Sequence, residues 1–171
     1  MPKSIPRISN CLWFDSEAEE AARFYVSLFP ESRISRVTHY TEAGTETHGR
    51  PAGSVMTVEF DLAGRSFRAL NGGPIFKFNE AVSIEVVCES QAEIDSYWSK
   101  LSAGGDPSGQ ACGWLKDRYG LSWQIVPKQL ADLMSDEDSA RASRVMTAML
   151  KMKKLDLAEL ERAASDRSEA A

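Results

Sequence analysis

A short helix-start pattern occurs twice in the chain, and this repetition constrains the fold more than any other feature. Ser16-Glu17-Ala18-Glu19 and Ser90-Gln91-Ala92-Glu93 both place a hydroxyl at a helix start and a carboxylate three residues later, the form of a capping box. The copies lie 74 residues apart, whereas the aromatic residues behind them repeat at a spacing of 73, which requires a one-residue slip. We therefore predict two modules of about 75 residues, each with a strand before its helix.

Apolar patterning extends both modules with further strands. Residues 8–14 and 83–88 are short, mostly apolar runs that are typical of strands. Residues 55–62 alternate apolar and polar side chains and are followed by a predicted partner strand at 66–70, whereas 41–53 has the composition of a loop. The sequence thus predicts an α+β domain over 1–127, with modules at about 5–74 and 75–127.

Only helices are expected in the remaining residues, 128–171. Ser135 and Asp156 are placed to cap two of them. The first carries an apolar stripe made of Val145, Met146, Met149, Leu150 and Met152. This stripe indicates core packing or a dimer seam, and a methionine-rich groove for a partner is the alternative.

Composition narrows the classes of partner. The 20 Lys and Arg residues against 25 Asp and Glu residues give a net charge of −5, which argues against nucleic acid as the main partner. No apolar run approaches the ~20 residues of a membrane span. Residues 1–10 lack the apolar stretch of a signal peptide, and the three cysteines are far apart. We therefore expect a cytoplasmic protein with reduced thiols and no membrane partner.

Residue inventory excludes several kinds of active site. The chain has no G-x-G-x-x-G or Walker loop for phosphates and no G-x-S-x-G elbow for a nucleophilic serine. Its two histidines, His39 and His48, are not accompanied by a cluster at metal-ligand spacing.

Polar and aromatic residues on the predicted strands are more informative. Glu59 and Gln124 lie opposite apolar faces, and Trp13, Trp114 and Trp123 supply large apolar area. Such a set is what a small-molecule pocket requires, although the tryptophans could equally pack beneath the helices.

Several motifs resemble one family along nearly the whole chain. The motifs are Cys11-Leu12-Trp13-Phe14-Asp15, Ala18-Glu19-Glu20-Ala21, Phe24-Tyr25, Leu28-Phe29-Pro30, Leu70-Asn71-Gly72-Gly73-Pro74, Phe78-Asn79-Glu80, Cys112-Gly113-Trp114-Leu115-Lys116-Asp117, Ser122-Trp123-Gln124, and the tail from Arg144-Val145-Met146 to Lys153-Lys154-Leu155. This set resembles the PhnB-like proteins of the vicinal oxygen chelate superfamily, which includes glyoxalases, bleomycin resistance proteins and dioxygenases. The resemblance implies paired βαβββ modules whose curved sheets enclose a cup, and a homodimer.

The same resemblance places the metal-ligand positions of the superfamily on residues that are poor ligands. The positions fall on Asn10, on 69–71 with Asn71 at its end, on Val82 or Ser83, and on Gln124. Because divalent transition ions prefer imidazole or carboxylate ligands, we expect neither a tight metal site nor another cofactor. Family members are often labelled 3-demethylubiquinone-9 3-methyltransferase, but the glycine-rich loop that S-adenosylmethionine would require is missing from the sequence.

The sequence therefore predicts a metal-free protein that binds a small molecule. The candidate ligand-binding residues are Asn10, Trp13, Glu59, Asn71, Trp114, Trp123 and Gln124. Two alternatives remain open. One is a lyase, isomerase or dioxygenase whose weak divalent site includes Gln124 and Glu59, and the other is an oligomerisation module that associates through its tail.

Overall fold

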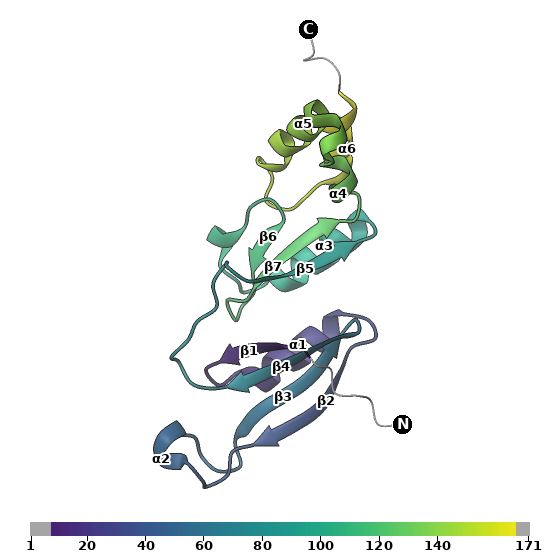
Figure 1. The fold of residues 1–171 in the computed structure, drawn as a ribbon. Coiled ribbons are helices and arrows are strands. Elements are labelled where there is room, and N and C mark those ends of the chain that lie inside the picture. The colour runs from purple at the N-terminus through teal and green to yellow at the C-terminus, as the bar shows by residue number, and fades with distance from the viewer. Residues whose placement is uncertain (1–7, 167–171) are drawn as a thin grey trace. The chain divides into compact units, whose positions relative to one another are not determined.

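The chain divides into two units, Met1–Lys77 and Phe78–Ala171. A computed structural model describes residues 8–166 of the chain (Figure 1). Both units combine one small sheet with helices, which confirms the predicted α+β class and the two-module plan. Within 8–166, none of the helices is both long and apolar enough to cross a lipid bilayer.

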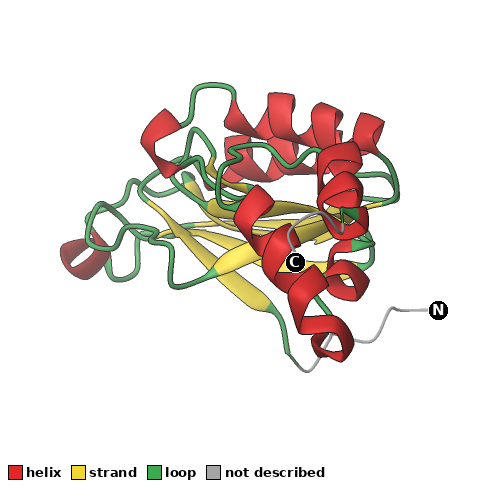
Figure 2. Cartoon of the chain, turned by 90° about the horizontal axis from the view of Figure 1, so that it is seen from above, coloured by secondary structure: helices red, strands yellow, loops and turns green. Residues whose placement is uncertain are grey.

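The first unit is a four-stranded sheet with one long helix on one face. Its elements are β1 (Asn10–Phe14), α1 (Ala18–Leu28), β2 (Arg33–His39), α2 (Thr45–His48), β3 (Val55–Leu62) and β4 (Arg65–Asn71). The strand order is β1-β4-β3-β2, in which β1 pairs in parallel with β4 and the other pairs are antiparallel. In both views the short α2 lies at the end of a projecting loop (Figures 1 and 2).

Strand alternation divides this sheet into a covered face and an open face. On the covered face, Tyr25 of α1 stacks on Phe60, which in turn stacks on Phe67, with ring centroids 6.4 and 5.4 Å apart. Leu12 and Val58 are buried on the same side. Since successive side chains alternate across a strand, Trp13 and Glu59 point to the opposite, open face.

The second unit begins with a smaller sheet. Its elements are β5 (Ser83–Cys88), α3 (Gln91–Ser102), the short 3₁₀ helix η1 (Pro107–Gly109), β6 (Trp114–Lys116) and β7 (Ser122–Pro127). The strand order is β5-β7-β6, so this sheet has three strands where the βαβββ pattern has four. The intervening residues 103–110 contain three glycines and a proline, which are depleted in strands, and they form η1 instead.

The C-terminal helices pack onto this second sheet. They are α4 (Leu130–Leu133), the 3₁₀ helix η2 (Asp136–Asp138), α5 (Ser139–Met149) and α6 (Leu157–Ser165). Val126 of β7 joins their apolar cluster, which includes Val145, Leu155 and Leu160. The predicted stripe is divided: Met149 and Met152 pack against the cluster, whereas Met146 and Leu150 are exposed.

Of the two predicted capping boxes, only the Ser90 cap forms, and the returning bond of Glu93 goes to the residue before the cap. Ser90 accepts a hydrogen bond from the Glu93 N–H, and the Glu93 carboxylate accepts one from the Glu89 N–H. The prediction for Ser16 is wrong, because α1 begins at Ala18 after Glu17, whose side chain makes no cap bond. An amide from β4 replaces it, as described below.

The three cysteines are free thiols in different surroundings. Cys88 is fully buried at the end of β5, and this burial, with the Glu93 charge nearby, raises the pKa of its thiol to about 11. Cys11 is exposed because β1 is an edge strand and this side chain points to the open face.

We expect iodoacetamide at pH 8 to modify Cys11 in the native protein while Cys88 stays unmodified. Alkylation needs an accessible thiolate, and Cys88 is both inaccessible and protonated at pH 8, well below its pKa of about 11. Peptide mass spectrometry measures the modified fraction at each site. Urea-unfolded protein, in which both thiols are alkylated, is the control, and native labelling of Cys88 at the Cys11 rate would contradict the prediction.

Candidate functional site

The open face of the first sheet carries a row of side chains that begins at a tryptophan ring and ends at two threonines, called the aromatic row here. Register places Trp13 of β1 beside Leu70 of β4, which pairs with Thr57 of β3. Thr57 in turn faces Thr38 of β2, and their hydroxyl oxygens are 2.6 Å apart. Trp13 is half-buried, so part of its ring is accessible on this face.

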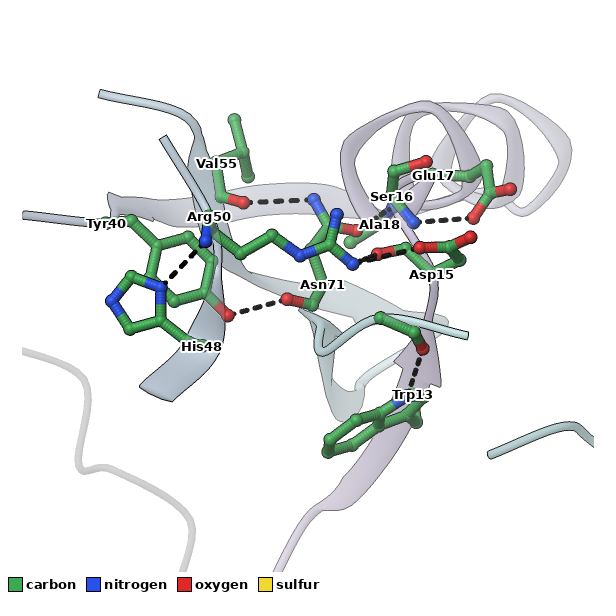
Figure 3. Close-up of polar contacts among 11 residues, drawn as sticks. Trp13, Asp15, Ser16, Glu17, Ala18, Tyr40, His48, Arg50, Val55 and Asn71 are labelled. Atoms are coloured by element: carbon green, nitrogen blue, oxygen red, sulfur yellow. Dashed lines mark hydrogen bonds and ion pairs between the residues drawn. The ribbon is translucent and has the colours of Figure 1, made fainter. Parts of the chain in front are cut away.

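The Trp13 ring is held by contacts on several sides. Its indole N–H donates to the Gly73 carbonyl at 2.8 Å (Figure 3). A Cβ at Gly72 would lie 2.1 Å from the ring atom Cζ2, so the Gly72 backbone is in direct contact with the ring. Phe76 meets the indole edge-to-face, with centroids 4.9 Å apart and an interplanar angle of 75°, and is itself 62% exposed. The result is a fixed indole beside an exposed phenyl ring.

Replacing Gly72 with alanine is expected to displace Trp13 and destabilise the first unit by roughly 1–3 kcal/mol, the usual cost of overpacking. Urea unfolding of single and double variants measures this. Since the clash requires the ring, G72A should cost much less in a Trp13→Ala background. Equal costs in both backgrounds would show that the Gly72 contact with the ring is not the cause.

A charged row lies next to the aromatic row. Register aligns Cys11, Arg68, Glu59 and Arg36 across the four strands. Glu59 Oε1 is 2.7 Å from Arg68 Nη2, and its Oε2 is 3.8 Å from Arg36 Nε. Glu59 therefore lies in an ion-pair ladder between two arginines, on the same face as Trp13.

Asn71 has a different place from the one expected of a ligand contact. It is 6% exposed, its Oδ1 accepts from the Ala18 N–H at 2.8 Å, and its Nδ2 donates to the Val55 carbonyl at 3.0 Å (Figure 3). Its own carbonyl accepts from the Tyr40 hydroxyl at 2.6 Å. The amide thus fastens the start of α1 to the start of β3, and both of its ends are occupied.

The loop before β3 is fastened to the same corner of the unit. The Tyr40 and His48 rings are 4.5 Å apart, and His48 Nδ1 accepts from the Arg50 N–H at 3.0 Å. Arg50 pairs with Asp15, which follows β1, at 2.9 Å (Figure 3). His48 therefore has structural partners here.

Asn10 and Trp123 also lie away from the open faces. Asn10 is exposed at the start of β1, and alternation places it on the side of Leu12. Trp123 is fully buried on the face under α3, where its indole N–H donates to Asp117 Oδ2 at 2.8 Å. A buried, hydrogen-bonded indole of this kind is a packing residue.

Trp114 and Gln124 share the face of the second sheet that α3 leaves uncovered, and the C-terminal helices cover this face at its Val126 end. In the strand register, Gln124 of β7 lies opposite Trp114 of β6 on one side and opposite Glu85 of β5 on the other. Gln124 Nε2 donates to Ser83 Oγ at 2.9 Å. Lys116, which also points to this face, pairs with Glu80.

The side chains at the expected metal positions do not fit a divalent transition ion. Both polar atoms of the Asn71 amide are hydrogen-bonded to backbone groups, and the Gln124 amide is hydrogen-bonded to the Ser83 hydroxyl. The groups that could ligate a metal at these positions are therefore amides and a hydroxyl. Across residues 8–166, no three His, Cys, Asp or Glu side chains are grouped so as to hold a metal ion. Such ions prefer imidazole, thiolate or carboxylate donors.

Three further residues of the first sheet's open face, Arg68, Arg36 and Phe76, were not predicted from the sequence. The signal for Arg68 was present, because it alternates with the buried Phe67 and Ala69 in β4. Nothing local indicated that Phe76, beyond the last strand of the unit, returns to the Trp13 ring.

The chain is similar to known proteins over most of its length. The family model for 3-demethylubiquinone-9 3-methyltransferase matches residues 6–126. A Bacillus cereus PhnB protein, whose name also describes it as a 3-demethylubiquinone-9 3-methyltransferase, is 34% identical with a TM-score of 0.62, covering 71% of this chain and 99% of its own. No curated protein matches the chain.

A second solved structure, of a protein from Pseudomonas aeruginosa, is 19% identical with a TM-score of 0.53, and the match covers 72% of this chain and 98% of that one. At that identity it supports the fold alone. The motifs, the two-module fold and the family match agree, and the chain belongs to the 3-demethylubiquinone-9 3-methyltransferase family as a PhnB-like protein of the vicinal oxygen chelate superfamily.

Proposed function

We propose that this protein binds a planar, largely apolar small molecule on the open face of its first sheet. The observation that carries the proposal is the immobilised Trp13 ring, which is fixed by Gly72 and Gly73 and flanked by the exposed Phe76. Aromatic pairs favour edge-to-face and offset-stacked contacts, so a planar ligand gains area and geometry there with little ordering cost. Trp114 and Gln124 of the second sheet are a separate candidate set within their own unit.

We propose that binding needs no metal ion. The amide and hydroxyl donors at the expected positions support this, and a divalent-metal-dependent lyase, isomerase or dioxygenase is the alternative. Elemental analysis of protein purified without chelator, then after incubation with Zn²⁺, Mn²⁺ or Fe²⁺, separates the two. A stoichiometric ion in either sample would overturn the metal-free proposal.

Methyl transfer, the activity in the family's name, is not part of the proposal. A site for S-adenosylmethionine would normally use a glycine-rich loop after the first strand of a doubly wound sheet. Here β1 is followed by Asp15, Ser16 and Glu17, and the strand order of the sheet is β1-β4-β3-β2.

We also propose, from the resemblance, a cytoplasmic homodimer, whose mass light scattering would measure.

The neutral probe N-phenyl-1-naphthylamine tests the binding proposal. The fluorescence of the probe should rise on titration with the wild-type protein. Titration with Trp13→Ala should give only a small part of this rise. Trp13→Phe keeps a ring and should retain part of it. Trp98→Ala, which removes a half-buried tryptophan of α3 in the other unit, is the matched control. Equal responses from the wild type and Trp13→Ala would refute a Trp13 site.

A further inference from the structure

We infer that the ligand of the first sheet is a planar aromatic anion, and that Arg68 binds its acidic group. This inference rests on the proposed function and deepens it by naming the chemical class. It combines the aromatic row through Trp13 with the charged row through Arg68.

The charged part of the open face has an excess of arginine. Among the described strand residues of this face, three are basic and two are acidic: Arg33, Arg36 and Arg68 against Glu59 and Asp61. Arg33 is within 3.7 Å of Asp61, and the other two arginines share Glu59. The Glu59 carboxylate thus pairs with two guanidinium groups. The strand residues of this face therefore have a net charge of one positive unit.

Of the three arginines, Arg68 is the one that lies next to the Trp13 ring. It lies two residues before Leu70 on β4, and Leu70 is the register partner of Trp13. Both side chains point to the same face, so the long guanidinium arm is a diagonal neighbour of the indole. Its side chain is 49% exposed even while it contacts Glu59.

A guanidinium group fits this role because its N–H groups form a planar fork. Carboxylate and sulfonate oxygens accept two parallel hydrogen bonds from such a fork, and these charge-assisted bonds are about twice as strong as neutral ones. A ligand that stacks on Trp13 could therefore direct its acidic group at Arg68. Its oxygens would take the place that Glu59 Oε1 now occupies at 2.7 Å.

Glu59 then acts as an internal competitor for the acidic group. Removing its charge should release Arg68 and strengthen anion binding, whereas a purely structural ion pair would give no such gain. The two members of one ion pair are thus expected to have opposite effects on affinity, which a general loss of stability cannot imitate.

Two probes with the same ring system test the inference. 8-Anilinonaphthalene-1-sulfonate is an anion, and N-phenyl-1-naphthylamine is its neutral counterpart without the sulfonate. We expect the wild type to bind the anion about tenfold more tightly, a ratio equivalent to one additional charge-assisted contact. Raising the salt concentration should weaken binding of the anion only, since exposed charges are screened.

Three variants locate the effect. Arg68→Gln should abolish the preference for the anion over the neutral probe, and Glu59→Gln should increase this preference severalfold. Arg65→Gln, which makes the same charge change at the start of β4 on the side of Leu62, is the matched control and should leave the preference intact.

The outcomes separate the inference from the proposed function. If neither probe binds in a way that depends on Trp13, both fail. If both probes bind equally well to the wild type, or if Arg68→Gln keeps the preference for the anion, only the inference fails. Weaker anion binding by Glu59→Gln would also overturn it, because Arg68 would then depend on Glu59 for its position.

Discussion

Asp117→Ala is expected to destabilise the second unit by roughly 3–5 kcal/mol, because hydrogen bonds to a charged acceptor contribute about 1.5–3 kcal/mol each. The carboxyl group is 2% exposed. Its Oδ1 accepts from the Tyr119 and Leu121 N–H groups at 2.8 and 3.0 Å, and its Oδ2 accepts from the Trp123 indole at 2.8 Å. The same group therefore shapes the β6–β7 turn and orients the largest side chain beneath α3.

Urea unfolding followed by tryptophan emission measures this loss. Asp117→Asn should be intermediate, since the amide keeps an accepting oxygen but turns a donor toward one of the three N–H groups. Asp106→Ala is the matched control, because that exposed carboxylate caps only η1 through the Ser108 N–H, a bond whose loss costs about 1 kcal/mol. A cost for Asp117→Ala no larger than this control would contradict the prediction.

Asn71→Ala is expected to destabilise the first unit by roughly 2–4 kcal/mol, from two buried backbone groups left unpaired at about 1–3 kcal/mol each. The Ala18 N–H has no access to water, since Ala18 is fully buried, and the Val55 carbonyl loses its Asn71 donor. Asn71→Asp keeps the shape and the acceptor for Ala18, but places an oxygen against the Val55 carbonyl.

Two measurements distinguish this role from ligand contact. Hydrogen exchange at the Ala18 amide should accelerate in Asn71→Ala, because its acceptor is gone. Asn10→Ala, in the same unit, removes an exposed amide and should change stability by about 0.5 kcal/mol or less. If Asn71→Ala were as harmless as Asn10→Ala while abolishing probe binding, Asn71 would be a ligand residue after all.

Local sequence patterns predicted most helices and strands, but they did not predict the contacts between elements that are distant in the sequence. The alternation in 55–62 and the cap at Ser90 both have local causes, and both formed as predicted. The start of α1 was predicted wrongly because its cap comes from Asn71, 53 residues away in the sequence. This hydrogen bond forms only when β1 and β4 are paired, so the residues around Ser16 alone do not predict it.

The site was predictable only as far as strand alternation reaches. Alternation separates Trp13 from Leu12, and Glu59 from Val58 and Phe60, but it does not say which face a helix will cover. For β7 it gave no guidance, because Trp123 and Val126 lie on opposite faces and both are buried, one under α3 and the other under the C-terminal helices. Arg68 required the register of β3 against β4, which sets its pairing with Glu59.

The attachment of the C-terminal segment has a consequence for cooperativity. The Cys112 and Gly113 N–H groups donate to the Met152 and Lys153 carbonyls. The Gln91 side chain bonds both the Leu155 carbonyl and the Leu157 N–H, as a neighbouring peptide group would. Because these bonds join α6 to the first turn of α3, opening the tail also exposes the start of that helix. The tail and the second sheet should then behave as one foldon, with amide protection lost together.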